Sequence, residues 1–167
     1  SNASLAAGKW ERTDFMGFEV RGKTLGLVGL GGIGAEVARR ARGLEMHVIA
    51  SDPVVSLDRA ALLCVTLVTP VAILSTSDFI SIHVPLTDST RHFIGSERLA
   101  MMKAGAYLIN AARGGIVDEE ALMDVLESGK LAGVALDVFE REPPKDSPLL
   151  RHPRVLSTPH LGASTLE

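Results

Sequence analysis

The sequence predicts an α/β protein built on a doubly wound parallel sheet with helices on both faces. Short runs rich in Val, Ile and Leu alternate with stretches whose apolar residues recur at helical spacing. The apolar runs are continuous rather than alternating, which is typical of strands buried on both faces. Helix-capping residues and glycines stand at the boundaries between these segments. With 167 residues, the chain is long enough for one domain with a full hydrophobic core.

The first half of the chain contains three of the expected strands. Residues 25–30 form an apolar run with glycine, and residues 33–43 follow with apolar positions at helical spacing. A second strand is expected at 47–50 and a third at 64–68. The dipeptide Thr69-Pro70 then supplies the N-cap and first residue of a short helix.

The second half continues the alternation. Four further strands are expected at 79–82, 106–109, 134–138 and 155–157. Ser96 is expected to cap a helix that stops near Gly105. Asp118 caps another, which has an acidic first turn and stops at Gly129. The proline-rich stretch 143–153 is interpreted as a surface loop.

The composition excludes several function classes. The net charge is −3 and there is no basic run, so nucleic acid and anionic membranes are not expected as partners. The uncharged stretch 60–77 is interrupted by Ser, Thr and Pro, and is interpreted as a buried strand and helix rather than a membrane span. Cys64 is the only cysteine, which excludes a disulfide framework, and no metal site is predicted. We interpret Cys64 as a small core residue of a cytoplasmic protein.

A glycine-rich turn, 29–34, joins the first strand to its helix. Gly29 permits a tight turn, Gly31 lets the backbone approach a pyrophosphate, and Gly34 lets the helix pack closely on the strand. Free N–H groups at the helix N-terminus favour phosphate. Asp52, after the next strand, would accept hydrogen bonds from the adenosine ribose and repel a 2′-phosphate, which favours NAD over NADP. The pattern predicts a Rossmann-type fold; a turn without a ligand and a solvated Asp52 are the alternatives.

Other chemistry-bearing residues also follow strands. Ligands of open parallel sheets bind beyond the carboxyl ends of the strands. Arg113 stands among small residues after the fifth strand, where its planar fork suits a carboxylate, although a plain surface arginine is the alternative. His160 follows the last strand, and histidine is the usual acid/base near neutral pH. Glu142 is its natural partner and would hold its tautomer.

Four segments resemble the D-isomer-specific 2-hydroxyacid dehydrogenase family, namely 22–31, 110–119, 136–140 and 158–165. The resemblance implies that Arg113 binds the substrate carboxylate, that His160 is the acid/base and that Glu142 is its partner. Asp137 would contact the nicotinamide end. The implied NAD contacts are Gly29, Gly31, Gly32, Ile33, Gly34, Asp52, Val84, Ala111, Ala112, Arg113, Asp137, His160, Leu161, Gly162 and Ala163. Gly32 departs from the family, in which many members carry a long polar residue beside the pyrophosphate.

The resemblance also concerns the whole protein. Segments 9–17 and 160–165 look most like the branch that oxidises 3-phospho-D-glycerate to 3-phosphohydroxypyruvate for serine biosynthesis. A glyoxylate or hydroxypyruvate reductase, or a non-enzymatic NAD-sensing module like the family's corepressors, are the alternatives. The resemblance implies a homodimer formed through this domain. Residues 1–3 are interpreted as a tag remnant and 4–167 as an excised, inactive NAD-binding domain whose substrate domain is missing.

Overall fold

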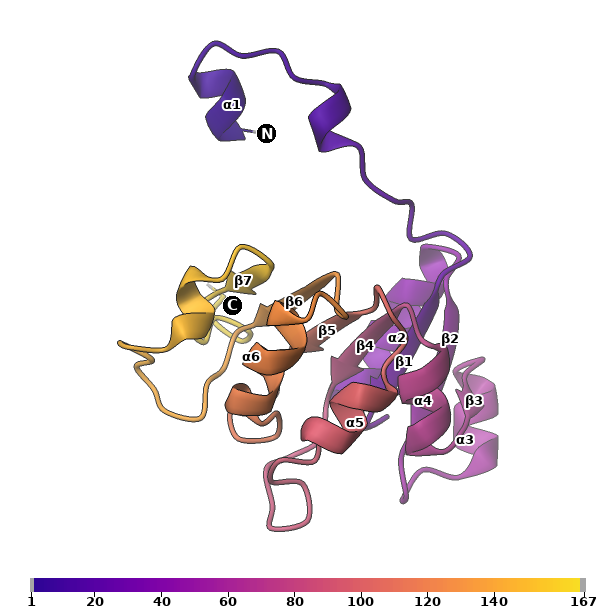
Figure 1. Cartoon of the computed structure of the whole chain (residues 1–167). Coiled ribbons are helices and arrows are strands. Elements are labelled where there is room, and N and C mark those ends of the chain that lie inside the picture. The colour runs from indigo at the N-terminus through magenta and orange to yellow at the C-terminus, as the bar shows by residue number, and fades with distance from the viewer. Residues whose placement is uncertain (1, 166–167) are drawn as a thin grey trace.

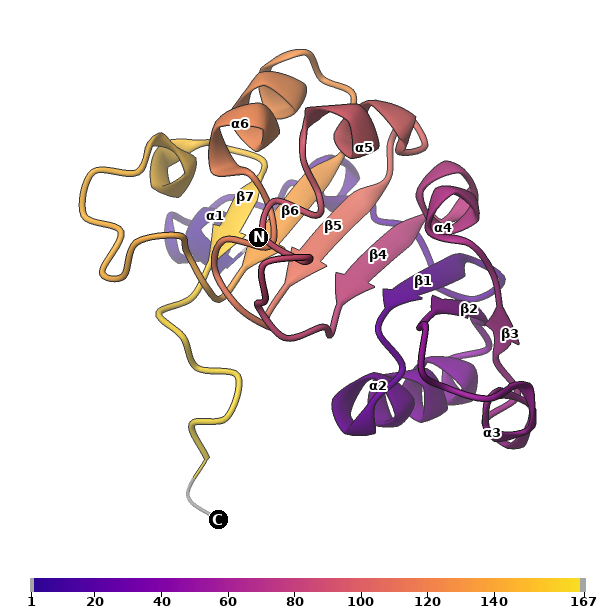
Figure 2. The same cartoon turned by 90° about the horizontal axis from the view of Figure 1, so that it is seen from below.

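The computed structural model describes residues 2–165, so Ser1 of the expected tag remnant and the last two residues of the expected domain lie outside it. Seven parallel strands form one sheet in the order β3-β2-β1-β4-β5-β6-β7 (Figures 1 and 2). The strands are β1 (Thr24–Val28), β2 (His47–Ser51), β3 (Thr66–Leu67), β4 (Phe79–Ile82), β5 (Tyr107–Asn110), β6 (Gly133–Leu136) and β7 (Val155–Ser157). The strand order reverses beside β1, which pairs with both β2 and β4. The predicted Rossmann-type doubly wound sheet is confirmed.

Helices cover both faces of this sheet. The covering helices are α2 (Gly32–Gly43), α3 (Leu57–Leu62), α4 (Pro70–Thr76), α5 (Ser96–Met101) and α6 (Glu119–Glu127), with the 3-10 turn η2 (Pro148–Arg151). Helix α1 (Asn2–Ala6) and the 3-10 turn η1 (Thr13–Phe15) belong to the N-terminal segment that lies away from the sheet. Figure 2 shows α4, α5 and α6 on one face and α2 and α3 on the other. Each layer encloses its own buried apolar cluster against the strands. Burial of this apolar surface is the main force that holds the layers together.

Two predicted helix caps are confirmed. The Thr69 hydroxyl accepts a hydrogen bond from the Ala72 N–H at 3.2 Å, with Pro70 as the first residue of α4. The Asp118 carboxylate accepts one from the Ala121 N–H at 3.0 Å at the start of α6. These bonds satisfy N–H groups that have no partner within their own helix.

The predictions for residues 57–68 were wrong in three respects. Helix α3 was not expected, because only Ala60 points inward, whereas Leu57 and Leu62 are 76% and 86% exposed. Cys64 is exposed rather than buried, since it stands in a left-handed turn (φ 52°) just after α3. The third strand is accordingly shortened to Thr66–Leu67.

Two further element predictions need correction. Ser96 is the first residue of α5 and its N-cap is Gly95, and the helix ends at Met101 rather than near Gly105. The Lys103 N–H donates to the Leu74 carbonyl at 3.0 Å, so a bond to α4 draws the chain out of the helix. The stretch 143–153 is not wholly a surface loop, because η2 buries Leu149 against the core.

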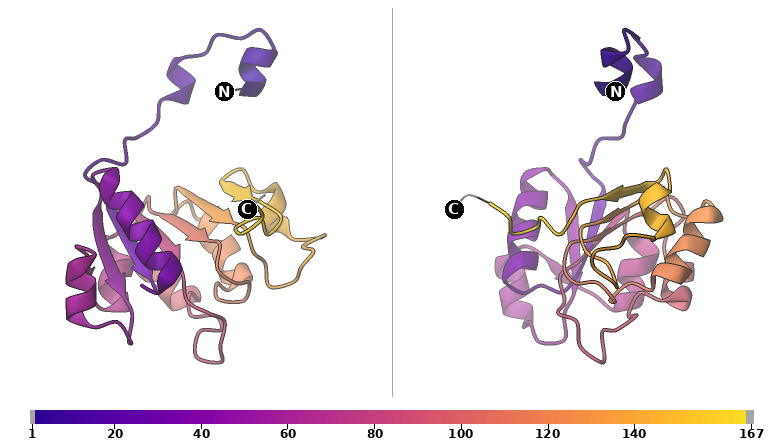
Figure 3. Two further views of the ribbon diagram at one scale, coloured as in Figure 1. Left: turned by 180° about the vertical axis from the view of Figure 1, so that it is seen from behind. Right: turned by 90° about the vertical axis from the view of Figure 1, so that its left-hand side faces the viewer.

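An N-terminal arm, residues 2–19, projects away from the sheet and its helices (Figures 1 and 3). It carries five exposed large apolar side chains, of which Trp10, Met16 and Phe18 are the most exposed; the other two are Leu5 and Phe15. Among residues 2–165, no helix has the length and apolar character needed to cross a membrane. Within the same range, no group of three or more His, Cys, Asp and Glu side chains is placed to hold a metal ion.

Candidate functional site

The predicted site residues lie along one edge of the sheet. Because all seven strands run in the same direction, their carboxyl ends meet at that edge. The loops that follow β1, β2, β5, β6 and β7 carry the glycine turn, Asp52, Arg113, Asp137 with Glu142, and His160. This edge, beside the strand-order reversal at β1, is where doubly wound sheets bind their ligands.

The four glycines of the turn form two pairs: close backbone contacts require one pair, and open space surrounds the other. Gly29 has φ 100°, and a Cβ there would lie 2.9 Å from the His83 carbonyl; at Gly34 a Cβ would lie 2.4 Å from the Gly29 oxygen. The fold itself therefore requires these two glycines. Gly31 and Gly32 have open space where a Cβ would stand. That space, at the N-terminus of α2, allows a phosphate to approach the backbone N–H groups.

Asp52 ties the glycine turn to the loop after β2. Its Oδ2 accepts a hydrogen bond from the Leu30 N–H at 2.8 Å. Its Oδ1 accepts from the N–H groups of Val54 at 2.9 Å and Val55 at 3.2 Å. Partial burial raises the pKa of this carboxyl, but the three backbone bonds outweigh it and hold the pKa below its usual value. Asp52 is therefore ionised at neutral pH, and it is more than a solvated turn residue.

A mainly apolar cavity of about 480 Å³ lies beside Asp52. It is lined by Val28, Ser51, Asp52, Pro53, Val68, Pro70, Val84, Ser89, Thr90 and Phe93. The predicted contact residue Val84 is among them, whereas Ser89, Thr90 and Phe93 were missed because their loop after β4 carries no recognisable motif. An apolar cavity next to an ionised carboxylate suits adenosine, whose base is flat and apolar-faced and whose ribose hydroxyls donate hydrogen bonds.

Asn110 shapes the loop that carries Arg113. Asn110 is buried at the end of β5; its Oδ1 accepts from the Ala112 N–H at 3.1 Å and its Nδ2 donates to the Arg113 carbonyl at 3.0 Å. The Arg113 side chain is exposed and donates to the Ala112 carbonyl at 2.6 Å. No role was predicted for Asn110, although a polar residue that ends an apolar strand is a recognisable signal.

Asp137 holds the loop on which His160 stands. This buried carboxylate accepts hydrogen bonds from the Thr158 hydroxyl at 2.5 Å and from the N–H groups of Leu161 and Gly162, both at 2.7 Å. The backbone carbonyl of Asp137 accepts a hydrogen bond from the backbone N–H of His160 at 2.9 Å. Burial raises the pKa of Asp137, but these bonds prevail and leave it below the ordinary value. Asp137 thus sets the position of the backbone on either side of His160.

His160 and Glu142 form a direct pair. The His160 Nδ1 lies 2.8 Å from Glu142 Oε2, and Glu142 Oε1 accepts from the Phe139 N–H at 3.1 Å. The bond from His160, and then that from Phe139, lower the pKa of the Glu142 carboxyl. His160 has left-handed backbone (φ 55°), which non-glycine residues rarely adopt. Its side chain is 51% exposed and that of Glu142 is 38% exposed.

The structure brings three of the predicted residues around one cavity. Asp137, Glu142 and His160 line a space of about 360 Å³ together with Phe139, Pro143, Pro144 and Pro159. Arg113 does not line that cavity. It stands at the same edge of the sheet, on the loop after β5.

Comparison with known proteins identifies the family. Residues 1–162 match the family described as D-isomer specific 2-hydroxyacid dehydrogenase, NAD binding domain. The whole chain is 52% identical to D-3-phosphoglycerate dehydrogenase 3, chloroplastic, of Arabidopsis thaliana, and 49% identical to the D-3-phosphoglycerate dehydrogenase of Methanocaldococcus jannaschii. The chain spans 29% and 32% of the length of these two relatives.

Solved structures agree with this assignment. A glyoxylate reductase from Paecilomyes thermophila is similar over 99% of this chain and 50% of its own, with a TM-score of 0.90 and 42% identity. D-lactate dehydrogenase with NAD+ from Lactobacillus jensenii is similar over 96% of this chain and 52% of its own, with a TM-score of 0.83 and 32% identity. The sheet order, the glycine turn and these similarities agree: this chain belongs to the D-isomer specific 2-hydroxyacid dehydrogenase family, as its NAD-binding domain.

Proposed function

We propose that the protein containing this chain is a D-3-phosphoglycerate dehydrogenase, which oxidises 3-phospho-D-glycerate to 3-phosphohydroxypyruvate. The whole chain is 48% to 52% identical to relatives of that name from plants, archaea, bacteria and humans. Identity to the glyoxylate reductase is lower, at 42%. The observation that carries the dehydrogenase chemistry is the His160–Glu142 pair, held at 2.8 Å on the ligand-binding edge.

The residues at this edge fit NAD. The open backbone at Gly31 and Gly32, with the N-terminus of α2, would hold the pyrophosphate. Asp52 and the apolar cavity beside it would hold the adenosine. Ala111, Ala112 and Asp137, together with residues 161–163, would surround the nicotinamide end. When bound, NAD supplies the acceptor for the hydride.

The observed hydrogen bonds support the proposed catalytic roles. Because Nδ1 of His160 faces the Glu142 carboxylate, Nδ1 carries the proton in the neutral ring and Nε2 presents its lone pair. Nε2 makes no hydrogen bond to any described residue, so it is free to take the proton from the substrate hydroxyl. Arg113 would bind the substrate carboxylate through its guanidinium fork.

A substrate panel tests this proposal. The full-length protein, assayed with NADH, is expected to show its highest kcat/KM with 3-phosphohydroxypyruvate. A higher value with glyoxylate or hydroxypyruvate would assign the protein to the reductase branch. Absence of turnover with all three would favour the NAD-sensing alternative and contradict the proposal.

Cofactor preference depends on the charge of Asp52. We expect NADH to bind at least about tenfold more tightly than NADPH, because the ionised carboxylate repels a 2′-phosphate.

Asp52→Asn should reduce this difference in affinity, and it keeps an oxygen that can accept a hydrogen bond from the Leu30 N–H. Asp52→Ala is the less informative variant, since it also removes three backbone bonds. Asp124→Asn, at an exposed position of α6, is the matched control. Calorimetric titration with both cofactors measures the ratio, and equal affinities in the wild type would contradict the prediction.

The homodimer is also part of the proposal, and the N-terminal arm supports it. Trp10, Met16 and Phe18 are exposed on a segment that projects from the domain (Figure 3), and exposed aromatic residues are typical of interfaces. Light scattering should show a dimer for this chain, and the double change Met16→Ser, Phe18→Ser should shift it toward monomer. Leu57→Ser, an equally exposed change on α3, should leave the dimer intact. A wild-type monomer in the tens-of-micromolar range would contradict this prediction.

A cytoplasmic location belongs to the same proposal. The bacterial relative is from Bacillus subtilis, whereas the names of two Arabidopsis relatives include the word chloroplastic. Fractionation of the source cells, followed by detection of the full-length protein, tests it.

A further inference from the structure

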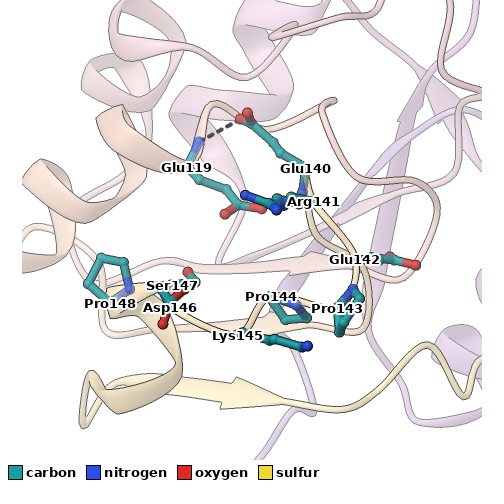
Figure 4. A pocket seen from close by; sticks show the side chains of 10 residues that line it. All are labelled: Glu119, Glu140, Arg141, Glu142, Pro143, Pro144, Lys145, Asp146, Ser147 and Pro148. Carbon is teal, nitrogen blue, oxygen red and sulfur yellow. Dashed lines mark hydrogen bonds between the residues drawn. The ribbon is translucent and has the colours of Figure 1, made fainter.

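Two glutamates outside the predicted site bind each other's backbone. Glu119 is the first residue of α6, and Glu140 lies in the loop after β6. Glu140 Oε1 accepts a hydrogen bond from the Glu119 N–H at 3.1 Å, and Glu119 Oε1 accepts one from the Glu140 N–H at 2.7 Å. Figure 4 shows the Glu140 side chain reaching the backbone nitrogen of Glu119. The two bonds close a ring that links the start of α6 to the loop leading to Glu142.

His92 adds a third link to the same point. The Nε2 atom of His92 lies 3.1 Å from Glu140 Oε1. The backbone N–H of His92 donates to the Gly115 carbonyl at 2.8 Å. Gly115 belongs to the loop that carries Arg113. Glu140 Oε1 therefore faces one group from α6 and one from a side chain anchored to the Arg113 loop.

The Arg113 loop also packs directly on the backbone next to Glu140. A Cβ at Gly114 would lie only 1.8 Å from the Phe139 carbonyl oxygen and 2.9 Å from the Glu140 nitrogen. The segments 113–114 and 139–140 thus touch on one side. The Glu119–Glu140 ring and His92 connect them through further contacts.

The glutamate pair and the loop that follows it border a cavity of about 510 Å³. It is lined by Glu119, Glu140, Arg141, Glu142, Pro143, Pro144, Lys145, Asp146, Ser147 and Pro148. Figure 4 shows the Glu142 side chain pointing away from Glu119 and Glu140. Phe139 anchors the start of this loop in the core, whereas residues 140–142 border the cavity. The hydrogen bonds of the paired glutamates are therefore well placed to determine where Glu142 stands.

We propose that Glu119 and Glu140 are positioning residues, which hold the Glu142–His160 pair in register with Arg113 through their reciprocal backbone bonds. The inference rests on the proposed function, since it assigns these residues to the same catalytic edge. Neither glutamate touches the reacting atoms in this role. Each acts through the loop that ends at Glu142, whose Oε1 accepts from the Phe139 N–H.

The charges around the pair indicate which variants are informative. The pKa of Glu119 is raised, mainly by burial. The hydrogen bond from the Glu140 N–H lowers this pKa, and the negative charge of the Glu140 carboxylate raises it. The other charged or titratable groups around the pair are His92, Asp118, Arg141, Glu142, Lys145 and Asp146. A glutamine keeps an acceptor oxygen for the backbone N–H and removes the repulsion between the carboxylates. An alanine removes the acceptor itself.

The first test uses this chain alone and needs no activity. In Glu119→Ala and Glu140→Ala, NMR titration should find the pKa of the Glu142 carboxyl raised toward its ordinary value, and the Phe139 amide should exchange faster. Glu119→Gln and Glu140→Gln should keep the wild-type values. Glu120→Ala is the matched control, because Glu120 is exposed in the same first turn of α6. If an alanine variant does not fold, Glu140→Asp serves, since it keeps the charge but shortens the reach.

The second test uses the full-length protein. The alanine variants should lower kcat about tenfold to a hundredfold, the range expected for small misplacement of a catalytic group, with little change in the KM for NADH. The glutamine variants should restore most of the loss. The inference is overturned if the Glu142 pKa and Phe139 exchange do not change in the alanine variants, if Glu120→Ala matches them, or if glutamine fails to rescue. A parent protein inactive on hydroxyacids would overturn the proposed function, whereas the result on the isolated chain would still decide the positioning.

Discussion

Replacing His160 with alanine in the full-length protein should lower kcat by about 10²- to 10⁴-fold, the usual contribution of general acid–base catalysis. The affinity for NADH should change little, because the glycine turn, Asp52 and the apolar cavity belong to other strands. Steady-state kinetics and NADH titration separate the two effects. His47→Ala, an exposed histidine at the amino end of β2, is the control. A His160→Ala protein that retains its turnover would remove His160 from the mechanism.

Glu142→Gln extends this prediction to the pair. It should lower kcat less than His160→Ala does, because glutamine still offers an oxygen to Nδ1 of His160. It should also displace the acidic limb of the pH–rate profile. Stability gives a second readout with a definite sign. The pKa of Glu142 is lowered in the folded chain, so its contribution is present above the ordinary carboxyl pKa and is lost as the pH falls through the folded value. The stability difference between wild type and Glu142→Gln should therefore shrink in acid.

The 167-residue chain alone should bind NADH and yet show no turnover of 3-phosphohydroxypyruvate above background. The cofactor-binding features are internal to the chain. The proposed catalytic side chains are open to water: His160 is 51% exposed and Glu142 is 38% exposed, and Arg113 is also exposed. Catalysis of hydride transfer needs the reacting atoms held roughly 3–3.5 Å apart in an enclosed site, and such positioning supplies several kcal/mol of the barrier.

Calorimetry and a spectrophotometric assay on one sample test this prediction. The full-length protein at the same molar concentration is the positive control. Robust turnover by the isolated chain would show that these residues suffice for catalysis. Failure to bind NADH would contradict the assignment of the cofactor site to this chain alone.

The sequence alone was sufficient to predict those elements and residues for which a local pattern has a single physical interpretation. Continuous apolar runs have to be buried on both faces, so the parallel sheet followed from them. Gly34 is required by the approach of the Gly29 backbone five residues earlier, and Asp118 caps a helix that begins beside it. The candidate residues Asp52, Glu142 and His160 were also found in sequence, because each follows a strand at the edge where ligands bind.

Only the tertiary structure decided what depends on contacts between distant segments. Helix α3 exposes both of its leucines, so the periodicity gave no signal for it, and Cys64 was assigned to the core in error. Helix α5 ends early because Lys103 bonds to α4. The ring between Glu119 and Glu140 joins residues 21 positions apart, and a first-turn glutamate otherwise predicts nothing beyond its favourable interaction with the helix dipole. Spacing along the chain identifies which residues reach the sheet edge, whereas hydrogen bonds across loops determine how those residues are held.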